Sequence, residues 1–161
     1  MAGAYNTPVN IYLACTVRGD RGAVAVLREV ADLLEGAGHT VLTRHLLDDN
    51  VDSAESTLTE REVFARDMQW LTAADVLIAE ASGSSYGVGF EVGYVLGRSG
   101  ATDQRVLLLY NDARRSAVSR LIVGADHPRC QVHGYQRAGD LMPVITRFLA
   151  AEVIPADVPY A

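Results

Sequence analysis

Residues 84–93, with the sequence SSYGVGFEVG, are the stretch around which the rest of the chain is organised. They follow an apolar run, residues 75–80 (DVLIAE), that is typical of a buried strand, and they lead into the helical pattern of residues 94–97. We therefore expect Glu91 in about the first turn of a helix, behind a loop of small residues. Helix N-termini present free N–H groups and partial positive charge, which suits an anion. We interpret Glu91 as a nucleophile and residues 84–89 as a loop that helps to hold its substrate.

The bulk composition is that of a soluble globular domain. The chain has 161 residues and a mass of 17.3 kDa, of which 49% are hydrophobic and 21% charged residues, enough for a substantial core. The net charge of −6 argues against nonspecific nucleic-acid binding, because such binding relies on neutralising phosphates. A phosphorylated small molecule remains open as a ligand, since a few local donors are sufficient to hold it.

Cysteine usage and hydropathy indicate a cytoplasmic protein. Cys15 and Cys130 form no disulfide or metal pattern, and His127 and His133 lack the spacing of zinc ligands with Cys130. No run approaches about 18 apolar residues, and the polar N-terminus is unlike a signal peptide. We expect no metal, no cofactor and no membrane or nucleic-acid partner.

Five apolar runs alternate with helical patterns, which predicts a parallel sheet covered by helices on both faces. The expected strands are residues 9–15, 39–43, 76–79, 105–110 and 130–135. The expected helices are residues 23–34, one opened at Thr59 by a capping box with Glu62, one ending near Arg98, residues 117–123 and residues 140–151. Residues 44–58 are polar and acidic and indicate a long surface loop that could act as a lid, and residues 111–116 indicate a basic loop. We expect one domain over residues 1–152 and a loose tail over 153–161.

For a chain of this size the expected architecture is a flavodoxin-like, Rossmann-like α/β three-layer sandwich with strand order 2-1-3-4-5. In that order the switch point lies between the first and third strands, and ligands bind beyond their carboxyl ends. The two segments richest in glycine and serine, residues 15–22 and 82–89, follow those two strands. This agreement places the expected site there.

The loop after the first strand has groups that suit a phosphate. Thr16, Arg18 and the Gly19 backbone offer a hydroxyl, a planar guanidinium fork and a free N–H. An ordinary surface turn with a solvated arginine is the alternative. The loop is neither a P-loop nor a G-x-G-x-x-G dinucleotide motif.

Three further residues are candidates for chemistry, each with a plainer alternative. Asp67 lies in the C-terminal half of its helix, where the helix dipole disfavours a carboxylate, so a partner or a function is expected to hold it there. A retaining glycosidic mechanism would place it about 5 Å from Glu91. Tyr12 could point into the site or into the core, and His45 could line the site or lie in solvent.

Four segments, in order, carry a resemblance to a known family: residues 11–19 (IYLACTVRG), 67–76 (DMQWLTAADV), 79–93 and 116–125 (SAVSRLIVGA). They resemble the 2'-deoxynucleoside 5'-monophosphate N-glycosidases of the nucleoside 2-deoxyribosyltransferase superfamily, and the likeness extends to about residue 150. The resemblance implies a homodimer that cleaves the N-glycosidic bond to give a free base and a sugar 5-phosphate.

The resemblance also implies roles for individual residues. Glu91 would form a glycosyl–enzyme intermediate, Asp67 would position it or assist proton transfer, and Tyr12 would lie beside both. The 5'-phosphate would bind the group Thr16, Arg18, Gly19, Ser85 and Gly87, with Ser119 reaching across from the other subunit. Val17 stands where a larger aliphatic residue is common, which bears on whether a 2'-hydroxyl is accepted, and His45 is a further candidate for contact with substrate.

Some features depart from the family pattern, and several functions stay open. Asp20 replaces a glycine beside the expected phosphate site. The alternatives to hydrolysis are base exchange by a deoxyribosyltransferase, a ribonucleotide hydrolase of the CMP type, and a nucleotide-binding module without catalysis. The preferred base and sugar are not determined by these residues.

Overall fold

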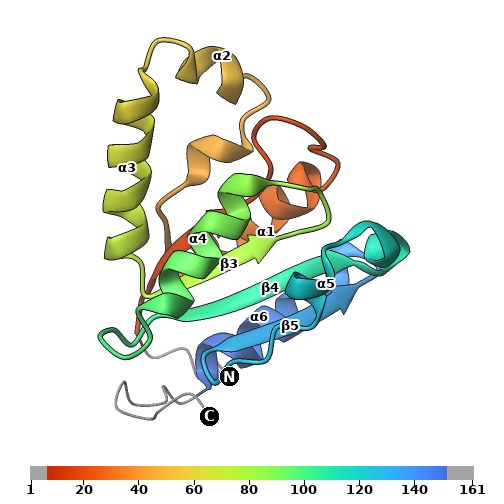
Figure 1. Ribbon diagram of the computed structural model, residues 1–161. Coiled ribbons are helices and arrows are strands. Elements are labelled where there is room, and N and C mark those ends of the chain that lie inside the picture. The colour runs from red at the N-terminus through yellow and green to blue at the C-terminus, as the bar shows by residue number, and fades with distance from the viewer. Residues whose placement is uncertain (1–6, 152–161) are drawn as a thin grey trace.

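The computed structural model describes residues 7–151 and has a five-stranded parallel sheet at its centre (Figure 1). The strands are β1 (Asn10–Ala14), β2 (Thr40–Val41), β3 (Val76–Glu80), β4 (Arg105–Asn111) and β5 (Cys130–Tyr135). Their order is β2-β1-β3-β4-β5, and every pairing between neighbouring strands is parallel. The predicted α/β architecture and strand order are confirmed.

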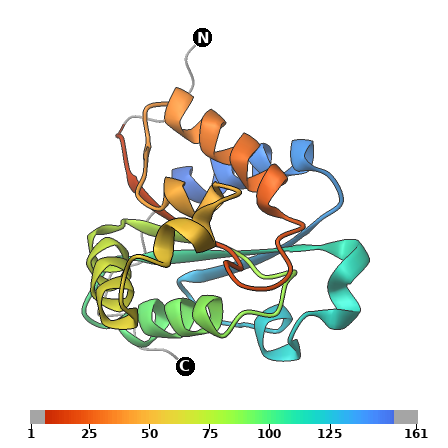
Figure 2. The same cartoon turned by 90° about the horizontal axis from the view of Figure 1, so that it is seen from above.

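Helices cover both faces of the sheet, so the molecule has three layers (Figure 2). The helices α1 (Val24–Gly36) and α6 (Leu141–Ala150) lie on one face, and α3 (Glu60–Ala73) and α4 (Tyr86–Gly97) lie on the other. Shorter helices join these elements: η1 (Arg44–Leu47), α2 (Val51–Glu55), η2 (Asp112–Ala117), α5 (Arg120–Val123) and η3 (Ala138–Asp140). Among residues 7–151, no helix has the length and apolarity needed to cross a membrane.

The core is divided by the sheet into two clusters because successive side chains of a strand point to opposite faces. Ile11, Leu13 and Ile78 pack against α1 and α6, whereas Tyr12 and Leu77 pack against α3 and α4. Burial on both faces explains why the central strands are continuous apolar runs in the sequence.

The capping box that opens α3 is present as predicted. The Thr59 side chain accepts a hydrogen bond from the Glu62 N–H, and the Glu62 carboxylate accepts one at 2.8 Å from the Thr59 N–H. The pair satisfies two N–H groups that the first turn of a helix would otherwise leave without partners. It fixes where α3 begins and therefore where Asp67 lies along it.

Two predicted loops are helical instead. In residues 44–58 the helices η1 and α2 form, because Leu46, Leu47 and Val51 are buried in the cluster beneath α1. Residues 111–116, predicted as a basic loop, lie largely in the 3-10 helix η2. The prediction of a long surface loop at 44–58 was therefore wrong in its secondary structure: the segment contains two short helices that three buried side chains hold in place. The predicted tail at 153–161 lies outside the described residues.

Candidate active site

A cleft of about 700 Å³ opens beyond the carboxyl ends of β1 and β3, where the switch point was predicted. One wall comes from the loops that follow these two strands and from the start of α4. The opposite wall comes from α2 and the first half of α3. Six of the predicted site residues line this cleft: Val17, Arg18, Asp67, Ser85, Gly87 and Glu91.

Glu91 is a partly buried carboxyl that reaches the cleft from the second turn of α4. It is the sixth residue of the helix, not a first-turn residue as predicted, so the helix dipole has little effect on it. Burial raises the pKa of Glu91 from its ordinary value of 4.5 to about 7, and the nearby charge of Asp67 contributes to the rise. A carboxylate that is poorly solvated near neutral pH is suited to act as a nucleophile or a base.

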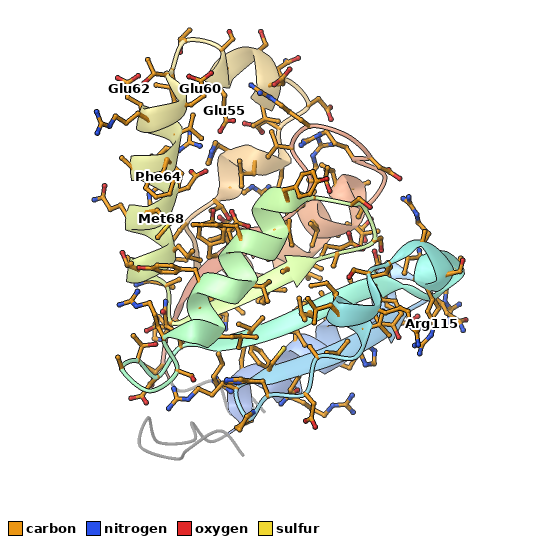
Figure 3. The ribbon with its side chains drawn as sticks, viewed as in Figure 1. Glu55, Glu60, Glu62, Phe64, Met68 and Arg115 are labelled. Carbon is orange, nitrogen blue, oxygen red and sulfur yellow. The ribbon has the colours of Figure 1, made fainter. Side chains whose placement is uncertain are left out.

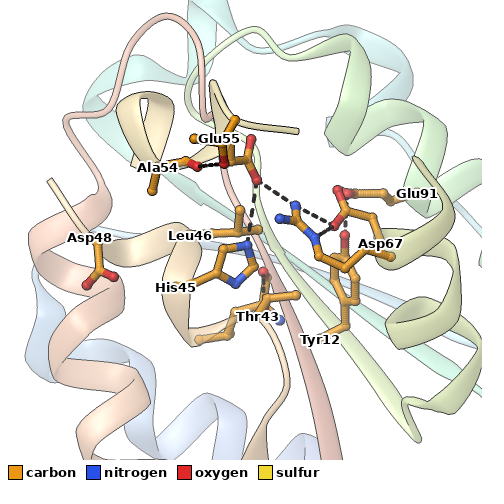
Figure 4. Close-up of polar contacts among 12 residues, drawn as sticks. Tyr12, Thr43, His45, Leu46, Asp48, Ala54, Glu55, Asp67 and Glu91 are labelled. Carbon is orange, nitrogen blue, oxygen red and sulfur yellow. Dashed lines mark hydrogen bonds and ion pairs between the residues drawn. The ribbon is translucent and has the colours of Figure 1, made fainter. Parts of the chain in front are cut away.

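Tyr12 combines both of the roles considered for it. Its side chain is fully buried in β1, and its hydroxyl donates a 2.7 Å hydrogen bond to Oε1 of Glu91 (Figure 4). This bond favours the ionised form of Glu91 and lowers its pKa, opposing the effect of burial. The pKa of the Tyr12 phenol is raised well above its ordinary value by burial and by Glu91, so the hydroxyl keeps its proton and remains a donor.

Asp67 faces Glu91 from α3 and has the partner that its helix position led us to expect. Arg66 donates a 2.9 Å hydrogen bond from Nε to Oδ1 of Asp67, and its Nη2 forms an ion pair with the same oxygen at 2.8 Å. Burial raises the pKa of Asp67, and Arg66 opposes that rise. Two carboxyl groups with raised pKa values, on facing helices and in one cleft, are the pair that glycosidic chemistry requires.

The start of α4 provides the groups for an anion. Ser85 is the N-cap of α4, and its Oγ accepts a 3.2 Å hydrogen bond from the Val88 N–H. Within residues 7–151 the Ser85 hydroxyl donates no hydrogen bond, and Gly87, in the first turn of α4, lines the cleft. Arg18 lines the same cleft, and its Nε pairs with Asp52 at 3.0 Å in an exposed ion pair.

The two glycine-rich loops are in close contact with one another. Thr16 is buried, and its hydroxyl lies 3.5 Å from the Gly83 carbonyl, so it supports the loop from behind and is absent from the lining of the cleft. Gly19 adopts a φ of +132°, which favours glycine, and it too is absent from that lining. Asp20 faces away from the cleft, towards Arg114, with which it forms an ion pair.

A buried hydrogen-bond network holds the second loop from below. Glu80, at the end of β3, accepts from the Ser82 N–H at 3.1 Å, from the Ser82 hydroxyl and from the Tyr135 hydroxyl at 2.9 Å. Ser82 Oγ in turn accepts a 2.7 Å hydrogen bond from the Asn111 N–H. These contacts join β3, β4 and β5 and fix the path of the chain into Ser85.

Two predicted site residues lie beside the cleft and not in its lining. His45 packs against Trp70 with a centroid separation of 5.0 Å, and its Nε2 lies 3.6 Å from Glu55. Burial and Arg66 lower the pKa of His45 and favour the neutral ring. Ser119 borders a separate groove of about 590 Å³, with Ser85 and Tyr86 on its other side.

The sequence did not single out Glu55, Arg66 or Phe64, all of which help to shape the site. Glu55 and Phe64 line the cleft, and Arg66 joins Glu55 to Asp67. Figure 3 shows Phe64 and Met68 pointing from α3 towards α4, where Phe64 meets Phe90 edge to face at 6.3 Å. The adjacency of Arg66 and Asp67 was visible in the sequence, but Glu55 lay in the segment predicted as a loop.

Cys15, which also lines the cleft, is not suited to be the nucleophile. Burial raises the pKa of its thiol to about 11, so it is protonated at neutral pH, and only the thiolate is strongly nucleophilic. Glu91 is therefore the better placed of the two groups.

Comparisons with known proteins agree with this geometry. The family model described as nucleoside 2-deoxyribosyltransferase matches residues 11–142. A protein of Thermofilum pendens, provisionally named 2'-deoxynucleoside 5'-phosphate N-hydrolase 1, is 37% identical over 145 residues, which are 90% of this chain and 98% of the relative. The 5-hydroxymethyl-dUMP N-hydrolase of Danio rerio is 35% identical over 130 residues, 80% of this chain and 87% of the relative.

Among solved structures, the CMP N-glycosidase of Clostridium botulinum aligns with a TM-score of 0.61. The alignment covers 86% of this chain and 98% of that chain, at 16% sequence identity. At this level of identity the likeness shows a shared fold.

Proposed function

Because the chain belongs to the nucleoside 2-deoxyribosyltransferase family, we propose that it is an N-glycosidase that hydrolyses nucleoside 5'-monophosphates to a free base and a sugar 5-phosphate. One observation carries the proposal. Glu91, with its raised pKa and its hydrogen bond from Tyr12, shares a cleft with Asp67 and with the N-terminus of α4. The cleft thus has a nucleophile, a second carboxyl group and an anion site.

The reaction follows from these positions. The Glu91 carboxylate attacks the anomeric carbon as the bond from that carbon to the base nitrogen breaks, and the base leaves with the bonding electrons and takes up a proton. That proton comes from solvent, and Asp67, which is paired with Arg66, is placed to position Glu91 and the sugar. Water then attacks the same carbon and releases Glu91, giving the sugar 5-phosphate.

The phosphate would bind at Ser85, Gly87 and Arg18, away from the reacting bond. Binding there holds the sugar in place, so the free energy of phosphate binding is used to orient the anomeric carbon against Glu91. This is why we favour a nucleotide over a nucleoside as the substrate. The family resemblance further implies a dimer in which Ser119, which lines a separate groove beside the start of α4, reaches the site of the other subunit.

The direct test is incubation with a panel of ribo- and deoxyribonucleoside 5'-monophosphates, with free base measured by chromatography. We expect base release by the wild-type protein, and a rate below about a thousandth of that for E91Q, since losing a nucleophile removes most of the catalysis. An unchanged circular dichroism spectrum of E91Q shows that the fold is intact. Near-normal turnover by E91Q would show that Glu91 is not the nucleophile.

The covalent step has its own measurement. A 2'-fluoro nucleotide slows attack by water, so the glycosyl–enzyme should accumulate and appear by mass spectrometry as a sugar-phosphate adduct on the peptide that contains Glu91. Base release without any adduct under these conditions would favour direct attack by water.

A second candidate is base exchange, which the name of the matching family favours. Both reactions pass through the same attack by Glu91 and differ in what resolves the intermediate. A second free base in the assay distinguishes them: a new nucleotide in place of sugar 5-phosphate would identify a transferase. Tight nucleotide binding without base release would identify a noncatalytic module.

A further inference from the structure

Part of the cleft wall has no role once Glu91, Asp67 and the phosphate site are assigned. It comes from the end of α2 and the start of α3, and consists of Glu55, Ser56, Leu58, Glu60, Val63 and Phe64 (Figure 3). With the phosphate at the start of α4 and the anomeric carbon at Glu91, the base of a nucleotide occupies the remaining end of the cleft. We call these six residues the base wall.

The base wall is apolar with acidic groups. Leu58, Val63 and Phe64 present surfaces against which a planar base can pack. Its charged members are Glu55 and Glu60, and among the described residues that line the cleft the only cation is Arg18, at the phosphate end. The polar edge of a bound base therefore meets hydrogen-bond acceptors and not cations.

Glu55 is the fixed member of this wall. Its Oε1 accepts a 2.5 Å hydrogen bond from Arg66 Nη2 and lies 3.6 Å from His45 Nε2 (Figure 4). Its side chain is 11% exposed, and the same Arg66 nitrogen holds Asp67 at 2.8 Å. The position of Glu55 is thus set by the group that also sets the second carboxyl group of the site.

The second oxygen of Glu55 is available to a ligand. Within residues 7–151, Oε2 of Glu55 makes no hydrogen bond, while the residue itself lines the cleft. A carboxylate paired with a guanidinium has acceptor sites and no donor, so this oxygen can satisfy an N–H group but not a carbonyl. A carbonyl group in front of Oε2 would be repelled, and both the carbonyl oxygen and Oε2 would lack a hydrogen-bond partner.

We propose that Glu55 determines base specificity and selects nucleotides whose base carries an exocyclic amino group, such as cytosine or adenine, over their oxo counterparts. The inference rests on the proposed function, because it assumes a nucleotide in the cleft. A glutamate accepting from the amino group of cytosine is an established way in which proteins distinguish this base. Sites built to bond a polar group reject the analogue that lacks it more strongly than apolar pockets do.

The test uses two matched pairs of substrates that differ at the amino position, dCMP with dUMP and dAMP with dIMP. We expect kcat/KM to favour the amino member of each pair by about tenfold. In E55Q this ratio should fall towards one, because a carboxamide can present either its N–H or its carbonyl group to the base. Glu29→Gln removes one negative charge outside the cleft, on α1, and should keep the wild-type ratio.

Three results would overturn the inference: equal or oxo-preferring turnover by the wild-type protein, an equal loss for all four substrates in E55Q, or a ratio that E29Q abolishes as well. The second would mean that Glu55 only supports Arg66 and Asp67. If no nucleotide releases its base, the proposed function fails by itself. Calorimetric dissociation constants of the same four nucleotides then decide about Glu55, since the amino preference and its loss in E55Q must appear in binding.

Discussion

The Glu91 carboxyl is governed by two neighbours with opposite effects. Its pKa is raised to about 7, because burial and the charge of Asp67 raise it more than the hydrogen bond from Tyr12 lowers it. A nucleophilic carboxylate must be ionised, so activity should increase as the pH rises through this pKa. The acidic limb of the pH profile therefore reports on the electrostatics of the site.

Tyr12→Phe and Asp67→Asn should move that limb in opposite directions. Loss of the Tyr12 hydroxyl raises the pKa of Glu91, so the acidic limb of kcat/KM moves to higher pH. Loss of the Asp67 charge lowers the pKa, and the limb moves to lower pH, whatever happens to the maximal rate. Rates measured from about pH 5 to about pH 9, roughly two units on either side of the expected pKa, give both positions. Glu29→Gln, an exposed change on α1, is the control, and shifts of the same sign in both variants would contradict this account.

The same carboxyl group should lower the stability of the protein at neutral pH. Between pH 4.5 and about 7 the folded protein retains a proton on Glu91 that the unfolded chain has lost, so stability falls as the pH rises through this interval. E91Q removes the effect and should be more stable than the wild-type protein above pH 7, by up to roughly 3 kcal/mol. Urea unfolding at pH 5 and pH 8 measures the difference, which should be larger at pH 8. A gain of equal size at both pH values would assign it to packing.

At the scale of elements, the site depends on how closely two loops approach. A Cβ atom added to Gly83 would lie 2.8 Å from Thr16 Oγ1 and 2.9 Å from the Asp20 carbonyl oxygen, closer than real contacts allow. The glycine is required by the neighbouring loop and not by its own backbone angles. It keeps the segments after β1 and β3 close together, so that Arg18 and Ser85 line one cleft.

Gly83→Ala should therefore separate the two loops and weaken phosphate binding. We expect a higher KM for nucleoside monophosphates, little change in the weak turnover of unphosphorylated nucleosides, and a loss of about 1–3 kcal/mol in the free energy of unfolding. Gly93→Ala is the matched control, since a Cβ there meets nothing within 4 Å and alanine favours a helix interior. Equal KM values for G83A and the wild-type protein would show that the loop spacing does not set phosphate affinity.

At the scale of the whole molecule, the fold was far more predictable than the site. Continuous apolar runs such as residues 105–110 imply burial on both sides, and their alternation with helices leads to a parallel sheet. The capping box at Thr59 marked the start of α3 for a purely local reason. Such signals lie within a few residues of one another, which is why sequence reasoning finds them.

The rest of the site depends on contacts between residues that are distant in the chain. The segment at 44–58 was predicted as a loop from its polar residues, although three apolar residues in it determine the packing. Arg66 binds Glu55 eleven residues away, a contact that exists only because α2 packs near α3. The pKa of Glu91 depends on burial and on Tyr12, 79 residues away in the sequence. None of these can be read from local spacing.

A dimer with shared sites makes a prediction that no single-chain assay tests. If Ser119 acts on the site of the other subunit, E91Q and S119A should restore activity to one another when refolded together. Half of the random dimers would then have one intact site, so activity should reach about a quarter of the wild-type value at low substrate concentration. Mass spectrometry of intact dimers, with one variant isotopically labelled, is the control that shows whether the subunits have exchanged. If activity does not recover although the subunits have exchanged, Ser119 does not contribute to the site of the other subunit.

The ion pair between Arg18 and Asp52 means that the cleft at rest already contains a substitute for its ligand. A phosphate reaching Arg18 exchanges one anion for another, and a dianion competes for the guanidinium better than a single carboxylate does. An uncharged nucleoside cannot displace Asp52 in this way. Asp52 and Glu55 lie one helical turn apart on α2. When phosphate releases Asp52 from Arg18, it therefore frees the same helix whose Glu55 we propose faces the base. Phosphate binding and base binding would thus both act on α2.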